Sequence, residues 1–329
     1  MSVNNKAPFS VVTYKRILFV LIKLSIVLGA SYFVYNKLTH NETLDFNFLL
    51  NSLHEHNIIT IKNMVLLILL SVINWGLECF KWKVLVSNFT PISFTEAIEQ
   101  SLGALTASIM TPNRIGEYGA KAIYFKKPFR KKVLGLTLIG NLSQLLITIM
   151  LGSIGLAYFV YQFQQEVDYD KIAAFVIISI TIIYLLFSFQ PHKKISIKGY
   201  SFQRLKNFTK KLHQKTIVFS ILLALFRYLV FAHQFYFLLI LFRIEASYIT
   251  AMALITSMYI ISSALPTIFI FDAVIKGSIA VWLFSFINAN ELTIVVITTL
   301  MWLLNFALPS VFGSYFVLNF KMNFSDPAT

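Results

Sequence analysis

Apolar blocks of about twenty residues recur along this chain, and an α-helix needs a block of that length to cross the hydrocarbon core of a bilayer. A soluble core would instead alternate apolar and polar positions along each element. Apolar side chains make up 57% of the 329 residues and charged ones only 13%, whereas a soluble domain exposes more charge. The sequence therefore predicts an all-α integral membrane protein, organised as a single polytopic domain over residues 1–329.

Six of these blocks are predicted to be ordinary spanning helices. They cover residues 17–35, 61–80, 133–161, 172–189, 217–242 and 292–320. The first block is too long for the apolar core of a signal peptide and lacks a small-residue cleavage site, so we expect it to remain as a helix.

Basic residues are concentrated in the loops between apolar blocks, and the net charge is +14. No soluble nucleic-acid-binding module is recognisable, so this charge indicates membrane topology and not a nucleic acid partner. Under the positive-inside rule, the basic stretches 126–132 and 193–215 belong in the cytoplasm and the acidic stretch 164–170 belongs outside. We therefore expect both termini in the cytoplasm and the protein in a cytoplasmic, inner-type membrane.

The segment 93–125 leaves the cytoplasmic side and must be back there before the bases at 126–132. Pro112 interrupts it, and a proline removes a helical hydrogen bond. These features favour a re-entrant segment made of two half-helices. The alternative is a kinked single span, which would put five clustered bases outside the membrane.

A second segment, 247–287, has the same organisation from the opposite side, with its break at Pro266. A spanning helix, a broken segment and a spanning helix thus occur twice, over approximately 61–161 and 217–320. This order predicts an inverted-topology repeat, which in secondary transporters places the substrate site where the broken helices meet.

Each break is followed by an acid and, four residues later, a lysine. Glu117 with Lys121, and Asp272 with Lys276, are therefore expected to pair along one helical face. Ionisable residues in membrane segments are costly and often line a substrate path, although an internally paired, purely structural contact would fit the same spacing.

Other polar residues fall on helical faces that would complete a cavity. Asn74, Glu78 and Lys81 form one stripe along a helical face. The alternative for Lys81, taken by itself, is that it snorkels, extending its ammonium to the membrane surface. Arg227 is expected roughly 15 Å into its helix, with Gln234 on nearly the same face. Arg227 is the strongest single candidate, and the structural alternative pairs it with a carboxylate of Glu78, Glu117 or Asp272. We expect His233 to be packed or interfacial, and Asn141 and Gln144 to bridge helices.

The run TPNRIGEYGAKAIYF, with NWGLECFKW before it and the second proline break after it, resembles the transmembrane-region family of lysylphosphatidylglycerol synthases. The resemblance covers most of the chain and implies a flippase-like membrane domain that moves aminoacylated or related phospholipids between leaflets. The family motif Thr-Pro-Gly-Gly-x-Gly-Glu matches Thr111, Pro112, Gly116 and Glu117, and the weaker second copy matches Pro266 and Asp272. Asn113 and Arg114 stand where the family has paired glycines. No stretch resembles the soluble transferase domain of the full synthases, so synthase activity is not expected.

The sequence thus predicts a lipid flippase or transporter whose partners are membrane lipids with anionic or zwitterionic head groups. The predicted substrate-binding residues are Glu78, Thr111, Pro112, Arg114, Gly116, Glu117, Lys121, Arg227, Gln234, Pro266, Asp272 and Lys276. One alternative is a membrane-embedded transferase that uses Glu117 or Asp272 as a base, and another is a scaffold that binds lipid or a partner through 193–215. Neither an enzyme signature nor a cofactor or metal motif is recognisable.

Overall fold

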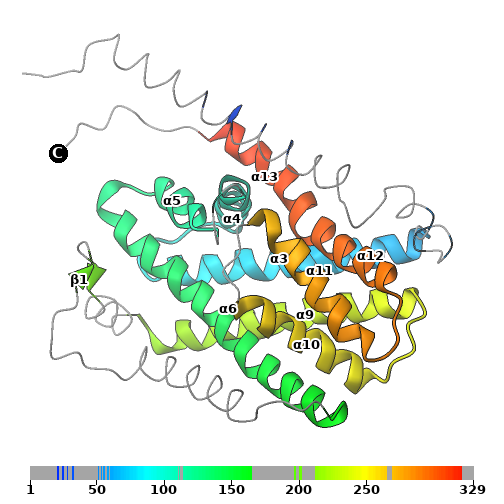
Figure 1. The fold of residues 1–329 in the computed structure, drawn as a ribbon. Helices are drawn as coiled ribbons and strands as arrows, with labels where there is room; N and C mark the ends of the chain where they lie inside the picture. Colours follow the sequence, from blue (N-terminus) through cyan, green and yellow to red (C-terminus); the bar gives the residue numbers. More distant parts are fainter. Residues whose placement is uncertain are drawn as a thin grey trace, which may run out of the picture.

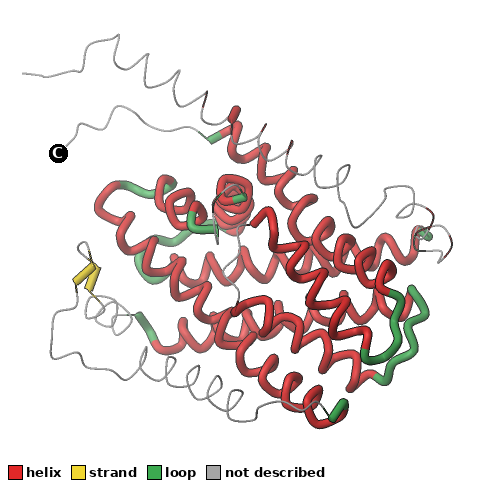
Figure 2. The backbone as a smooth tube through the Cα atoms, viewed as in Figure 1, coloured by secondary structure: helices red, strands yellow, loops and turns green. Residues whose placement is uncertain are grey.

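The computed structural model describes residues 61–109, 111, 114–164, 212–264 and 269–320, together with residues 196–197 and 200–201 and isolated positions before residue 61. Helices form most of this part of the chain (Figure 1, Figure 2). It also contains one small antiparallel hairpin, β1 (Ser196–Ile197) and β2 (Tyr200–Ser201). The predicted helical class is therefore confirmed for the described ranges, with this hairpin added.

The first half contains α3 (Ile61–Val86), α4 (Phe94–Ser108), α5 (Gly116–Ile123) and α6 (Lys127–Gln162). A capping box starts α4: Ser93 Oγ accepts from the Glu96 N–H at 3.1 Å, and the Ser93 N–H donates to Glu96 Oε2 at 2.6 Å. Helix α6 begins six residues earlier than predicted, because Pro128 is tolerated in a first helical turn that needs no N–H donor.

The second half contains α9 (Gln214–Leu241), α10 (Tyr248–Ala264), α11 (Phe269–Ser285) and α12 (Glu291–Trp302). A π-helical turn, η1 (Leu303–Ala307), then joins α12 to α13 (Leu308–Asn319). The side chains of α11 are described from Val274 onward.

Four helical segments are long and apolar enough to cross a membrane: Ile61–Val86, Lys127–Gln162, Gln214–Leu241 and Glu291–Asn319. Each coincides with a predicted span to within three residues at its ends, except that α6 begins six residues early and α3 extends six residues beyond residue 80. Helix α10 and the described part of α11 are apolar but shorter. The other two predicted spans, 17–35 and 172–189, lie outside the continuously described ranges. The four apolar helices indicate a membrane protein.

Both predicted breaks interrupt the helices. Helix α4 ends at Ser108 and α5 begins at Gly116, while α10 ends at Ala264 and α11 begins at Phe269. Pro112 and Pro266 themselves lie outside the described residues.

Helices α3 and α9 run side by side through the centre of the bundle (Figure 1). On either side of this pair, α6 packs along α10 and α13 packs along α4. Two glycines allow these outer contacts to be close. A Cβ on Gly155 of α6 would overlap Thr256 of α10, and a Cβ on Gly313 of α13 would overlap Leu102 and Thr106 of α4. Small residues at helix crossings are the usual means by which membrane helices approach one another.

Candidate functional site

Helices α3 and α9 are joined by an ion cluster in the middle of their contact. Glu78 Oε2 accepts from Lys81 Nζ at 2.7 Å and from Arg227 Nη1 at 2.7 Å. Arg227 Nε also donates to Asn74 Oδ1 at 3.2 Å, and Nη1 donates to Gln144 Oε1 at 3.4 Å. The predicted polar stripe on α3 is thus confirmed. Lys81 is buried against Glu78, so the snorkelling alternative is wrong.

Asn305 extends this cluster through the π turn. Its Oδ1 accepts from Asn74 Nδ2 at 2.9 Å and its Nδ2 donates to Gln234 Oε1 at 2.9 Å, while Gln234 Nε2 donates to Ser71 Oγ at 2.8 Å. Pro309 lies four residues after Asn305 and has no N–H to donate to the Asn305 carbonyl, as a regular helix would require. Trp75 Nε1 donates to that carbonyl instead, at 2.9 Å.

A second ion cluster lies at the start of α5. Glu117 Oε1 pairs with Lys121 Nζ at 2.8 Å, and Glu117 Oε2 pairs with Arg114 Nη2 at 3.2 Å. The predicted pairing of Glu117 with Lys121 is confirmed. Lys121 Nζ also lies 4.3 Å from the centroid of the Trp82 ring. Trp82 lies on α3, about one helical turn after Glu78. The second cluster, on α5, therefore contacts α3 about one turn away from the first cluster.

The Thr111 hydroxyl organises the first break. It donates to the Ser108 carbonyl at 2.7 Å and accepts from the Gly116 N–H at 2.9 Å, so one side chain satisfies backbone groups at the end of α4 and the start of α5. Arg114 adopts a positive φ of 55°, in the left-handed region that favours glycine. The sequence identified Thr111 by its motif but not this capping role.

Burial divides the charged residues into two groups. The side chains of Glu78, Lys81, Glu117 and Lys121 are each at most 10% exposed, whereas those of Arg227 and Arg114 are 19% and 27% exposed. Four basic side chains meet two carboxylates, so the ion pairs within the described residues leave an excess of positive charge. Among the charged groups of the two clusters, the guanidinium groups of Arg227 and Arg114 are the most exposed.

The remaining predicted residues are more dispersed. Gln234 joins the Asn305 network and makes no direct ion-cluster contact among the described residues. Lys276 lies in α11 against the ring of Phe306, with Nζ 5.5 Å from the ring centroid. The side chain of Asp272 lies outside those described, so its predicted pairing with Lys276 stays a prediction.

Asn141 bonds Tyr118 and Gln144 bonds Arg227, which confirms that both amides bridge helices. His233 is exposed and bonds Tyr248.

Two participants were not found from the sequence. Asn305 and Trp75 are essential to the network, yet each stands in an apolar block without a periodic polar partner that would single it out. The available signal was Pro309, since a proline inside a spanning helix frees a carbonyl that some donor must satisfy. Among the described residues, no group of three or more His, Cys, Asp or Glu side chains is arranged to hold a metal ion.

The fold and the buried ion pairs define the class of a helical membrane protein with a polar interior. No family model matches the chain, and no match was found among curated proteins or solved structures.

Proposed function

We propose that this protein is a flippase-type transporter that moves a lipid with a phosphate-bearing head group between the leaflets of a membrane. The observation that carries the proposal is the excess of positive charge in two ion clusters, one between α3 and α9, which are long enough to span a bilayer, and one on α5 beside α3. Charged groups at such positions are costly unless they are paired, and they commonly mark a substrate path.

Arg227 and Arg114 are the proposed head-group contacts, because they combine partial exposure with unused donors. The hydrogen bonds of Arg227 within the described structure use Nε and Nη1, which leaves Nη2 for a ligand. The described ion pair of Arg114 uses Nη2, which leaves Nη1 for a ligand, while its Nε is buried and has no hydrogen-bond partner among the described residues. A guanidinium matches phosphate geometry better than an ammonium does. Glu78 and Glu117 are each already paired with two internal cations, which favours an anionic phosphate over a cationic amine as the group that this site binds.

The packing of the helices supports an inverted repeat as part of this proposal. When α3, α4, α5 and α6 are exchanged with α9, α10, α11 and the α12–α13 segment, the contact of α6 with α10 becomes the contact of α13 with α4, and α5 with α6 becomes α11 with α12. In this scheme the broken segments enter from opposite sides, both termini are cytoplasmic and the membrane is of the inner type.

The resemblance to the transmembrane region of lysylphosphatidylglycerol synthases also belongs to the proposal. Its support is the left-handed backbone at Arg114, where the family motif has a glycine, together with the double role of Thr111. Arg114 here combines a glycine-like backbone with a partly exposed guanidinium.

The test is lipid translocation in proteoliposomes, measured with a fluorescent phosphatidylglycerol whose outer-leaflet copies are quenched by an impermeant reductant. Arg227→Gln removes the proposed contact, while Arg243→Gln makes the same chemical change at an exposed position after α9. We expect Arg227→Gln to slow translocation by about tenfold or more, as the loss of a charge-assisted contact predicts, and Arg243→Gln to have no effect. Equal rates in protein-containing and empty liposomes would refute transport, and equal rates in both variants would refute the site.

A further inference from the structure

A row of uncharged polar side chains connects the two arginines that are proposed to hold the phosphate. Asn141 Nδ2 donates to Tyr118 Oη at 3.2 Å, and Gln144 Oε1 accepts from Arg227 Nη1 at 3.4 Å. Asn141 and Gln144 are three residues apart in α6, so they share a helical face. Tyr118 follows Arg114 by four residues, at the start of α5. The row therefore extends from α5 across α6 to α9.

These three uncharged side chains are half-buried, and the two amides lie near the middle of α6, a helix long enough to span a membrane. A polar side chain at that depth is costly when it faces lipid, and it more often lines a substrate path. Among the described residues, the Tyr118 hydroxyl hydrogen, Asn141 Oδ1 and Gln144 Nε2 have no hydrogen-bond partner. Two donors and one acceptor are thus left beside the proposed head-group contacts.

A hydroxyl group matches this mixture of donors and acceptors, because it donates one hydrogen bond and accepts others. An ammonium only donates, so it would find one acceptor here and two groups that cannot accept from it. We propose that these three side chains bind the hydroxyls of a polyol or sugar head group, whose phosphate is held by the two arginines. This inference rests on the proposed function, which supplies the phosphate contacts, and adds the chemical class of the head group.

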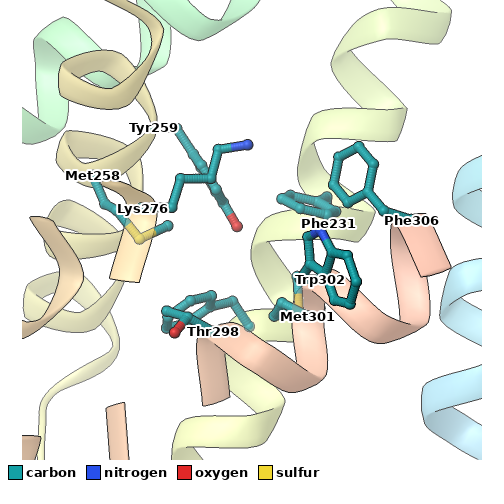
Figure 3. A pocket seen from close by; sticks show the side chains of 9 residues that line it. Phe231, Met258, Tyr259, Lys276, Thr298, Met301, Trp302 and Phe306 are labelled. Atoms are coloured by element: carbon teal, nitrogen blue, oxygen red, sulfur yellow. The ribbon is translucent and has the colours of Figure 1, made fainter. Parts of the chain in front are cut away.

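The surroundings of α11 have a different character. Lys276 of α11 lies at a pocket lined mostly by aromatic and thioether side chains, among them Phe231, Met258 and Phe306 (Figure 3). The described residues that line this pocket include no amide side chain. We therefore expect the head-group hydroxyls at the row on α5 and α6 and not beside Lys276.

A matched pair of lipids tests this inference. Phosphatidylglycerol and phosphatidylpropanol have the same charge and a head group of the same carbon skeleton, but phosphatidylpropanol lacks the free hydroxyls. Native mass spectrometry of the purified protein, mixed with equal amounts of both lipids with identical acyl chains, measures which lipid is retained. We expect phosphatidylglycerol to be preferred by about tenfold, the effect of hydrogen bonds to neutral partners.

Substitutions that keep the size of the side chain then locate the contact. Asn141→Leu and Gln144→Met should each reduce the preference by about threefold, because each removes one of these partners. Asn319→Leu makes the same change at an exposed amide of α13 and should leave the preference unchanged. A purely structural effect on Arg227 would weaken the binding of both lipids equally, so the ratio of the two separates recognition from positioning.

Equal retention of the two lipids, or retention of neither, would overturn the inference even if translocation is observed. A preference that survives unchanged in both variants would overturn the assignment of these residues. A preference without translocation in proteoliposomes would refute transport and leave the head-group inference standing, so the two failures are distinguishable. Gel filtration identifies variants that do not fold. Tyr118→Phe removes only a hydroxyl, and it should also reduce the preference by about threefold if Asn141→Leu does not fold.

Discussion

The indole N–H of Trp75 donates to the backbone carbonyl of Asn305 at 2.9 Å, across 230 positions of sequence. The carbonyl is available because Pro309 cannot donate to it, so the π turn η1 presents to α3 a backbone acceptor that a regular helix would have used internally. The Asn305 side chain meanwhile bonds Asn74 and Gln234. One interrupted turn thus joins α3 and α9 to the last helical segment.

Asn305→Ala should therefore destabilise the protein more than removal of an amide that makes a single bond. The substitution leaves buried Asn74 and Gln234 each short of a partner, and we expect a loss of about 2–4 kcal/mol in the free energy of unfolding, at about 1–2 kcal/mol for each orphaned group. Unfolding by SDS titration from mixed micelles measures this. The matched control is Asn141→Ala, which removes the single described bond of Asn141 to Tyr118 and should cost about 1 kcal/mol or less. Equal losses in the two variants would show that the Asn305 network carries no special stability.

Much of the helical framework was predictable because the bilayer allows few alternatives. Apolar length located α3, α6, α9 and the α12–α13 segment to within a few residues at most ends. The extension of α3 to Val86 was not predicted, because Lys81 and Lys83 suggested that the helix left the membrane there. Lys81 pairs with Glu78 within α3, but its burial depends on neighbouring helices such as α6, where Gly140 lies close to the Lys81 side chain, and apolar length alone does not reveal this.

Glu78→Gln should be among the most damaging single substitutions in the ion cluster. Lys81 and Arg227 both pair with the same oxygen of Glu78, and Lys81 is 2% exposed, so neutralising the carboxylate leaves two cations facing each other in a low-dielectric setting. We expect a loss of about 3–5 kcal/mol in the free energy of unfolding, as for other buried pairs that lose one partner. The same SDS titration measures it.

A second substitution tests the cause. Adding Lys81→Met to Glu78→Gln removes the buried cation together with its lost partner, so the double variant should regain at least about 1 kcal/mol relative to Glu78→Gln alone. If the losses in the free energy of unfolding measured for Glu78→Gln and for Lys81→Met simply add in the double variant, the ion pair is not the source of the effect.

The site was predictable where helical spacing alone brings residues together. Glu117 and Lys121, and the stripe of Asn74, Glu78 and Lys81, follow from spacings of three and four residues. The choice of Glu78 as the partner of Arg227 depends on which helices are neighbours, and several carboxylates were open candidates. Asn305 was not identified, since no local pattern in an apolar helix marks an amide whose partners lie in two distant helices.

Gly155→Ala should destabilise the contact of α6 with α10. An added Cβ would overlap the Thr256 hydroxyl and approach the Ala253 carbonyl, and the backbone partner cannot rotate away. We expect a loss of about 1–3 kcal/mol in the free energy of unfolding, the usual cost of overpacking. Gly76→Ala is the control in α3, where nothing lies within 4 Å of the added Cβ, and it should stabilise by up to about 1 kcal/mol through helix propensity. A stabilised Gly155→Ala would show that the two helices are not in close contact.

Two substitutions of Arg114 separate the energetic cost of its left-handed backbone from the contribution of its ion pair with Glu117. Arg114→Ala and Arg114→Gly both remove the contact with Glu117, but only glycine relieves the positive φ of 55°. Arg114→Gly should therefore be more stable than Arg114→Ala by about 1 kcal/mol, the usual penalty for a left-handed L-residue. Both should lose lipid translocation equally if the guanidinium contacts the head group. If Arg114→Gly instead translocates like the unmodified protein, the break at Thr111 needs only its backbone shape, and Arg227 alone would remain as the proposed phosphate contact.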